Sequence, residues 1–358
     1  MRVVVAVLTL ACVASACGGS GREHPRVWVL LGDAERDRGS RLLRSDDGGA
    51  SWSEPLPLPA GIELTAIAFR TRDRGFGVTR RGEVLATSNG GGSWMTVLPP
   101  VLVNDGDAVT TIAVSPAGHV VAGGQIALDP AFFPRPLAII SDDDGQTWTT
   151  LAMQAGIGPV RRVCSTTEGD VLVAFARPVR GSDVYELAVS RPEDRALTAT
   201  SVPATEPEPR RGSAIGCVGE GQFWTAGFLQ RSETSPSYSS VWTSPDAALT
   251  WDNRGASLPE DAKLLDVTFS DPEHGWLASG SSLYRTTDGG VTWTPKNMPV
   301  AGLYDEVRIA AASSADVMLI MRASGEPIGL ISADAGRTWR ILSLPRSSRG
   351  IVAWSFQR

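Results

Sequence analysis

Short runs in which apolar and polar residues alternate at every second position recur along the chain from residue 26 onward. One unit shows the pattern clearly, as "LLDVTFS" (264–270), "HGWLASG" (274–280), "SLYRTT" (282–287) and "TWTPKN" (292–297). Alternation with a period of two is typical of half-buried β-strands. Each unit therefore predicts four short antiparallel strands, and the chain is expected to be all-β.

An octet with the pattern S/T-x-D/N-x-G-x-S/T-W recurs at a predicted hairpin tip. Its six copies are "SDDGGASW" (45–52), "TSNGGGSW" (87–94), "SDDDGQTW" (141–148), "SPDAALTW" (244–251), "TTDGGVTW" (286–293) and "SADAGRTW" (332–339). The copy at 244–251 has Ala248 where glycine is expected. The gap of 103 residues between Trp148 and Trp251 is about twice the other gaps. A decayed seventh copy, "SRPEDRAL" (190–197), fits in the middle of it.

The spacing of the octets predicts a ring. Trp52 and Trp339 are 287 residues apart over six intervals, which is about 48 residues per unit, and 26–358 provides 333 residues for seven units. The first unit lacks a first strand, which "IVAWSF" (351–356) can supply. We therefore expect a seven-bladed β-propeller of four-stranded antiparallel blades over 26–358. In it the C-terminal strand completes blade one and removes two open sheet edges.

The octet contains groups that a cation site would use, but its own turn can use all of them. The aspartate can accept backbone N–H groups of the turn, and glycine allows positive φ. The tryptophan is expected to bury its ring between adjacent sheets and to need one acceptor for its N–H. A calcium loop requires more oxygen ligands and a later acid, which even "SDDDG" (141–145) lacks. The octet thus predicts structure rather than a metal site.

The N-terminus has the pattern of an export signal. Arg2 precedes an apolar run from Val3 to Val13, eleven residues that are too few to span a bilayer. The following "ASAC" (14–17) resembles a bacterial lipoprotein lipobox, with Ala14 where that pattern prefers leucine.

We accordingly expect a signal peptide over 1–16, then a lipidated Cys17 and flexible linker over 17–25, with the membrane contacted through this anchor alone. The alternative is an ordinary signal peptide cut after Ala16 with Cys17 left free. Gly18 favours the outer membrane, if the host has one, so the expected location is the cell envelope on its periplasmic side.

Charge and residue spacing exclude several classes of partner. A formal net charge of −6 and a pI near 5.3 argue against a nucleic-acid partner. The three histidines (His24, His119 and His274) are far apart and have no zinc-type spacing with cysteine. No phosphate-binding loop or dinucleotide fingerprint occurs. No cofactor is expected.

The octet is identified as the Asp-box, or BNR, repeat, which occurs in sialidases, sortilin-type receptors and several β-propeller families. Among these, "DPEHGWLASGSSLYRTTDGGVTW" (271–293) closely resembles the repeat of photosystem II stability/assembly factor-like (YCF-type) proteins, and "DRGFGVTRRGEVLATSNGGGSW" (73–94) resembles it more loosely. The lipobox, with no plastid-type transit segment, departs from that family. The resemblance implies a non-catalytic, monomeric binding or assembly propeller with a protein partner, a glycan being the open alternative.

The rival interpretation is an exported glycoside hydrolase similar to a sialidase. The nearest string to the "FRIP"-like motif of that family is "FFPRP" (132–136), in the wrong order. None of the tyrosines has a recognisable nucleophile context; they are Tyr185, Tyr238, Tyr284 and Tyr304. Glycosidase chemistry needs two carboxylates across a cleft. Loop acids such as Glu168, Asp170 and Glu273 could supply them, but the chain has 39 acids. We expect no catalytic residue and no enzyme.

Two cysteines remain after processing, Cys164 and Cys217, and the oxidising compartment favours a disulfide between them. Both lie on predicted innermost strands of adjacent blades. Aligning Gly169 with Gly221 offsets them by one residue, so that they face opposite sides of their sheets and can meet across the blade interface. The alternative is two small buried residues in the core.

Long loops are the expected binding segments, because rigid strands hold variable loops at the propeller faces. Phe132 and Phe133, between prolines, are the candidate apolar contact, with buried loop anchors as the alternative. Arginine-rich pieces could form a positive patch or simply be solvated turns; they are 70–74, 79–81, 160–162 and 209–211.

Overall fold

The computed structural model describes residues 24–32, 40–100, 107–127, 134–152, 158–179, 182–194, 196–200, 210–219, 221–229, 238–254, 258–259, 264–298, 300, 302, 304, 306–322, 327–342 and 351–357. Within these residues the regular secondary structure consists of strands, β1 to β27, and contains no helix. The predicted all-β class is confirmed.

Six of the sheets have four antiparallel strands in sequence order, and we number the blades along the chain. Blade two holds β3 (Leu64–Phe69), β4 (Gly75–Thr79), β5 (Val84–Thr87) and β6 (Met95–Leu98). Blade three holds β7 (Ala108–Val114), β8 (Val120–Ile126), β9 (Arg135–Ser141) and β10 (Thr149–Ala152). Blade four holds β11 (Val160–Ser165), β12 (Val171–Val179), β13 (Ser182–Ser190) and β14 (Thr198–Thr200).

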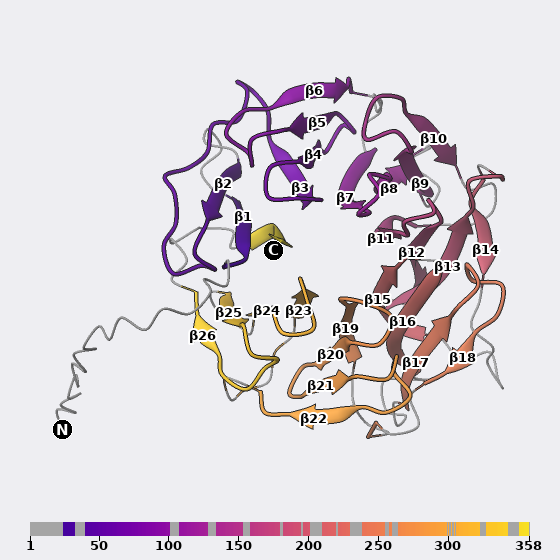
Figure 1. Ribbon diagram of the computed structural model, residues 1–358. Helices are drawn as coiled ribbons and strands as arrows, with labels where there is room; N and C mark the ends of the chain where they lie inside the picture. Colours follow the sequence, from indigo (N-terminus) through magenta and orange to yellow (C-terminus); the bar gives the residue numbers. More distant parts are fainter. Residues whose placement is uncertain are drawn as a thin grey trace, which may run out of the picture.

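Blade five holds β15 (Arg210–Val218), β16 (Gln222–Leu229), β17 (Tyr238–Ser244) and β18 (Asp252–Asn253). Blade six holds β19 (Leu264–Phe269), β20 (Gly275–Ser279), β21 (Leu283–Thr286) and β22 (Thr294–Lys296). Blade seven holds β23 (Glu306–Ala311), β24 (Val317–Arg322), β25 (Ile328–Ser332) and β26 (Arg340–Ile341). All the sheets are arranged around a common centre, and in these six the first strand is innermost (Figure 1). They are consistent with a seven-bladed β-propeller.

Blade one joins the two ends of the chain. The C-terminal strand β27 (Ile351–Gln357) pairs antiparallel with β1 (Arg26–Gly32), which pairs with β2 (Ser40–Ser45). The register runs from Arg26 opposite Gln357 to Leu31 opposite Ile351. The C-terminal strand therefore occupies the innermost position of blade one, as the sequence predicts.

The expected fourth strand of blade one is reduced to one bridge, between Leu42 and Leu56. The prediction that every blade has four full strands was therefore wrong for blade one. The physical reason is the segment "SEPLPLPA" (53–60), whose alternating prolines lack the N–H that a ladder needs. Leu56 still donates its N–H to the Leu42 carbonyl (2.8 Å). A proline-rich rim also blocks pairing with another chain.

Each pair of neighbouring blades buries its own hydrophobic cluster, and the clusters follow one another around the ring. The cluster between blades seven and one contains Met318 and Ile331 from blade seven with Val27 and Val29 from blade one. Side-chain packing therefore joins the last blade to the first. Burial of this apolar surface is the main stabilising contribution at every interface.

Stacked aromatic rings reinforce two of these interfaces. Trp28 stacks on Phe69 of the next blade with ring centroids 3.8 Å apart, and Trp224 stacks on Phe269 at 3.9 Å. An octet tryptophan, Trp94 or Trp293, meets the edge of each phenylalanine. The strand tryptophans are thus core residues, as expected for Trp28, Trp224 and Trp276.

The propeller has two different faces. The turn from first to second strand and the octet turn from third to fourth strand lie together, because Gly90 N donates to Asp73 O (2.8 Å) and Gly289 N donates to Glu273 O (2.9 Å). We call this side the box face. The other connections, including all long ones, leave from the opposite ends of the strands, and we call that side the loop face.

Candidate functional site

The Asp-box turns use their polar groups internally. In the last copy, Ser332 Oγ donates to Asp334 Oδ1 (2.8 Å) and accepts the Gly336 N–H (2.9 Å). Asp334 also accepts the Thr338 N–H (2.9 Å) and the Thr338 hydroxyl (2.6 Å). The same set recurs in four other copies. In the copy at 87–94 Asn89 accepts the Ser93 N–H but donates its Nδ2 to the Ser93 hydroxyl. The predicted hairpin tips are confirmed.

The fourth and fifth octet residues both adopt positive φ. Glycine fills most of these positions, but Asp144, Ala247, Ala248 and Ala335 also have φ between 52° and 64°. The turn directs the fourth carbonyl toward the preceding blade, whose side chains donate to it. Trp28 donates to Gly90 O (2.9 Å), Arg74 to Asp144 O (2.8 Å) and Arg191 to Ala247 O (2.7 Å). The octet therefore links adjacent blades.

Hydrogen bonds also set the ionisation of the octet carboxylates. The side-chain hydrogen bond from Thr147, followed by its backbone N–H, lowers the pKa of Asp143 to about 2. For Asp334, desolvation raises the pKa, but the hydrogen bonds from Thr338 outweigh it and lower the pKa to about 2. These carboxylates are ionised and satisfied within the turn. Among the described residues, no group of three or more His, Cys, Asp or Glu side chains could hold a metal ion.

The octet tryptophans differ in whether a described residue accepts their N–H. Trp251 and Trp293 are buried and hydrogen-bonded, to Thr200 (3.3 Å) and to Arg254 O (3.1 Å). The indole nitrogens of Trp52, Trp94 and Trp339 have no protein partner in the part of the chain that the structure describes. The decayed copy lies in the turn between β13 and β14, and buried Leu197 takes the tryptophan position.

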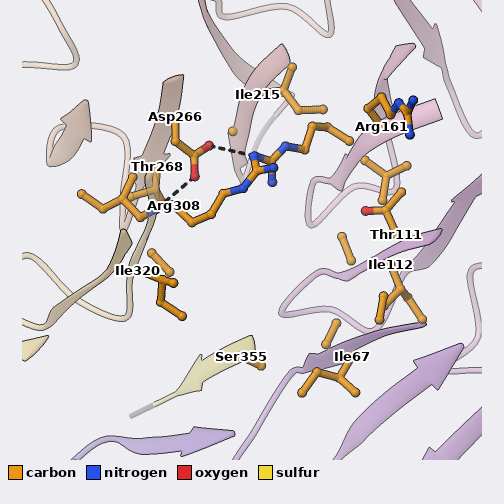
Figure 2. A pocket seen from close by; sticks show the side chains of 18 of the residues that line it. Ile67, Thr111, Ile112, Arg161, Ile215, Asp266, Thr268, Arg308, Ile320 and Ser355 are labelled. Carbon is orange, nitrogen blue, oxygen red and sulfur yellow. Dashed lines mark hydrogen bonds and ion pairs between the residues drawn. The ribbon is translucent and has the colours of Figure 1, made fainter. Parts of the chain in front are cut away.

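The innermost strands surround a central cavity of about 530 Å³. Each blade contributes to its wall, and blade one does so through Ser355. Figure 2 shows Asp266 and Arg308 on one side of the cavity and Arg161 and Thr111 on the other. Isoleucines and hydroxyls separate the charged side chains. The cavity wall therefore combines apolar surface with a few charged side chains, as is common in ligand-binding sites.

Four arginines and two carboxylates line the cavity, so its wall is net positive although the whole chain carries −6. We call Arg161, Arg162, Arg308 and Arg322 the arginine group. Glu306 pairs with Arg308 (3.3 Å) and with Arg322. Arg161 is exposed.

Asp266 is the buried acid of the cavity wall. Its Oδ2 accepts the Ile309 N–H (3.0 Å), and its Oδ1 lies 3.7 Å from Arg162 Nη2. This ion pair joins blades four and six across β15, which presents Ile215 and Gly216 to the cavity. Burial raises the pKa of Asp266, against the opposing effects of Arg162 and the Ile309 N–H. The Nη2 atom of Arg162 has no hydrogen-bond partner among the described residues.

The two cysteines meet across the interface of blades four and five. Cys164 on β11 and Cys217 on β15 have Cα atoms 6.0 Å apart, and their Sγ atoms are paired as a disulfide. Cys217 also lines the cavity. The other candidate site residues, Cys17, Phe132 and Phe133, lie outside the described residues.

The arginine-rich pieces do not form one patch. Arg70 and Arg74 lie on the box face and contact Asp144 (3.5 and 3.1 Å), whereas Arg161 and Arg162 line the cavity. Sequence reasoning missed Asp266, Glu306, Arg308 and Arg322. For Glu306 and Arg308 the signal was present in "DEVRIAA" (305–311), where these charged residues occupy alternate positions of an innermost strand.

A family model described as "Photosynthesis system II assembly factor YCF48" matches residues 245–351. The "Photosystem II assembly lipoprotein Ycf48" of Trichormus variabilis is 50% identical over 44 residues, which are 12% of this chain and 13% of that relative. The chloroplastic "Photosystem II stability/assembly factor HCF136" of Cyanidioschyzon merolae is 23% identical over 308 residues, covering 68% of this chain and 67% of the relative.

Solved structures share the fold. "YCF48 bound to D1 peptide" has a TM-score of 0.53 and 20% identity, covering 88% of this chain and 93% of its own. An ancestral GH74 enzyme has a TM-score of 0.54 and 12% identity, covering 93% of this chain but 46% of its own. No helix long and apolar enough to cross a membrane occurs in the described part of the chain. Repeat, family model and architecture agree: the chain is a BNR-repeat β-propeller related to the photosystem II assembly factors of the YCF48 type.

Proposed function

We propose that this propeller is an exported, lipid-anchored, non-catalytic scaffold that binds an anionic segment of a protein partner at the central cavity. The observation that carries the proposal is the positive wall of that cavity in an otherwise acidic chain. Guanidinium groups bind carboxylates through paired, charge-assisted hydrogen bonds. The isoleucines between them would contact the apolar parts of the same segment.

The relatives support a scaffold. They are named as assembly factors, and one solved relative was obtained with a peptide bound. One relative is also named a lipoprotein, which supports lipidation of Cys17 in this chain. We infer further that the protein is a monomer, with a glycan as the alternative ligand; size-exclusion chromatography and glycan binding measure the two.

The carboxylates of the cavity support a non-catalytic role. Asp266 and Glu306 are each engaged with an arginine, Asp266 with Arg162 and Glu306 with Arg308. Of the loop acids that might serve a glycosidase, Glu168 and Asp170 belong to the β11–β12 turn and Glu273 to the β19–β20 turn, all on the box face. Measurable hydrolysis of glucans or sialosides by the purified protein would contradict this part of the proposal.

Binding to a labelled acidic peptide tests the site. The probe is a fluorescein-labelled peptide of alternating glutamate and serine, with a glutamine–serine peptide as its neutral control, measured by anisotropy on the soluble Cys17→Ser protein. We expect binding of the acidic peptide alone, weakening with salt. Arg161→Gln and Arg308→Gln should each reduce affinity about tenfold, because a hydrogen bond to a charged group contributes about 1.5 kcal/mol.

Arg81 provides the matched control, because it is an exposed arginine on the loop face that does not line the cavity. Arg81→Gln should leave the affinity unchanged. Equal affinities for wild type and both cavity variants, or an equal loss in the Arg81 variant, would show that the cavity is not the binding site.

A further inference from the structure

The chain enters the propeller on the box face. Arg26, the first residue of β1, contacts Asp46 of the first octet and Asp73 of the β3–β4 turn (3.0 Å to Asp73). Arg72 of the same turn donates to His24 O (3.0 Å), and Pro25 is buried. The residue from which any N-terminal tether departs is therefore held against the box face.

The arginine group lies at the other end of the cavity. Because the first and second strands of a blade connect on the box face, each innermost strand begins at the loop face. Arg161 is the second residue of β11, and Arg308 is the third residue of β23. Arg322 is the last residue of β24, which runs back to the loop face. The tether and the arginine group thus belong to opposite faces.

The tether is too short to reach around the rim. Seven residue steps separate Cys17 from His24, and a fully extended chain spans at most about 3.6 Å per residue, or about 25 Å. From β1 the path outward crosses β2 and the bridged edge at 53–56, about 10 Å at one strand spacing each. It would then follow the six-residue height of β2, about 20 Å more.

We propose that the anchored protein holds its box face against the membrane and its loop face, with the arginine group, toward the aqueous side. The inference rests on the proposed lipidation of Cys17 and deepens the proposed function. It assigns the direction of approach: the anionic partner segment must come from the side away from the anchoring membrane. A segment lying in the headgroup layer of the same membrane would meet the box face instead.

Site-specific quenching tests the orientation. The full-length lipidated protein is placed in vesicles containing a nitroxide-headgroup lipid, with a fluorophore on a single introduced cysteine. Ala50→Cys in blade one and Val291→Cys in blade six report the box face at two positions around the ring, and Arg81→Cys reports the loop face; all three positions are exposed. Labelling is done without reductant, so that a bridged Cys164 and Cys217 do not react. The protein without an introduced cysteine gives the background.

We expect quenching at residues 50 and 291 to exceed quenching at 81 at least about threefold, because strand height separates the faces by about 20 Å. A 20-residue Gly-Ser insertion after Gly21 should bring the three sites close to equality. Equal or reversed quenching without the insertion would overturn the proposal. Quenching that persists in the Cys17→Ser protein would also overturn it, because the lipid-anchored tether would then not determine the orientation of the propeller. Peptide binding by the soluble protein is measured separately, so failure of the orientation and failure of the site are distinguishable.

Discussion

The Asp-box aspartate organises its turn as an acceptor, and nothing in the arrangement needs a bound ion. Asn89 shows this directly, because its Oδ1 accepts the Ser93 N–H (2.9 Å) and its Nδ2 donates to Ser93 Oγ (2.9 Å). An amide can therefore replace the carboxylate when the hydroxyl of the seventh octet residue, here Ser93, accepts a hydrogen bond instead of donating one. The negative charge adds strength to these hydrogen bonds.

Removing one octet acceptor should destabilise the ring locally. Asp334→Ala leaves the Thr338 N–H without its acceptor and should lower the free energy of unfolding by about 1–2 kcal/mol, as loss of a helix cap does. Asp334→Asn should cost less, because it reproduces the turn at Asn89. Thermal melting of the three proteins checks the order.

The pH dependence of the melting temperature separates the contribution of the Asp334 charge from that of its hydrogen-bonding geometry. The folded pKa of Asp334 is about 2, below the ordinary 3.8, so its carboxylate contributes stability that is complete above pH 4 and lost as the pH falls through 2. The advantage of wild type over Asp334→Asn should shrink across that window. An advantage that is constant from pH 6 to pH 2 would contradict the assigned role.

At the scale of strands and blades, hydrophobic periodicity predicted the strands well, but it predicted poorly which residues line the cavity. Innermost strands contain register shifts, between Val160 and Arg162 in β11 and between Leu264 and Asp266 in β19. An extra residue at such a bulge inverts which alternate positions face the cavity. A simple period-two pattern therefore loses its phase at Arg161, Arg162 and Asp266, whereas β23 has no register shift and keeps its alternation at Glu306 and Arg308.

Local turn chemistry was predictable for a different reason. The hydroxyl, acid and glycine of an octet meet within eight residues, so sequence alone shows their contacts. The donors to the fourth carbonyl come from the preceding blade, as Arg191 does for Ala247, 56 residues away. Only the closed arrangement of blades brings a donor and its carbonyl together, so no local sequence pattern predicts these contacts.

The Cys164–Cys217 pair provides a test of one blade interface. The disulfide closes a loop with a sequence separation of 53, for which the chain-entropy model gives at most about 4 kcal/mol. We expect reduction, or the double Cys164→Ser and Cys217→Ser variant, to lower the melting temperature of the protein. Two titratable thiols in the denatured, non-reduced protein would show that no bridge forms; a single-serine variant controls for loss of packing.

At the scale of the whole molecule, the interfaces form a continuous cycle only when blade one is complete. Ser355 Oγ on β27 accepts the Phe69 N–H on β3 (3.0 Å), so the last strand contacts blade two as well as β1. Without β27, two strand edges would be open at the centre of the propeller.

Deleting residues 351–358 should abolish the single cooperative melting transition and cause association, because the exposed edges pair with other chains. A synthetic peptide of residues 349–358 should restore the monomer and the transition. Light scattering and calorimetry measure both effects, and a scrambled peptide is the control. A truncated protein that stays monomeric with an unchanged melting temperature would contradict the role of the C-terminal strand.

Blade one also imposes an order in time. Its outer strands are synthesised first and its innermost strand last, with the six other blades made in between. A chain that folds as it is made therefore holds an unfinished first blade until β27 is available. A chain that lacks β27 keeps the unpaired edge of β1, which is open to pairing with another chain. Closure of the ring therefore requires that the segment carrying β27 has been made.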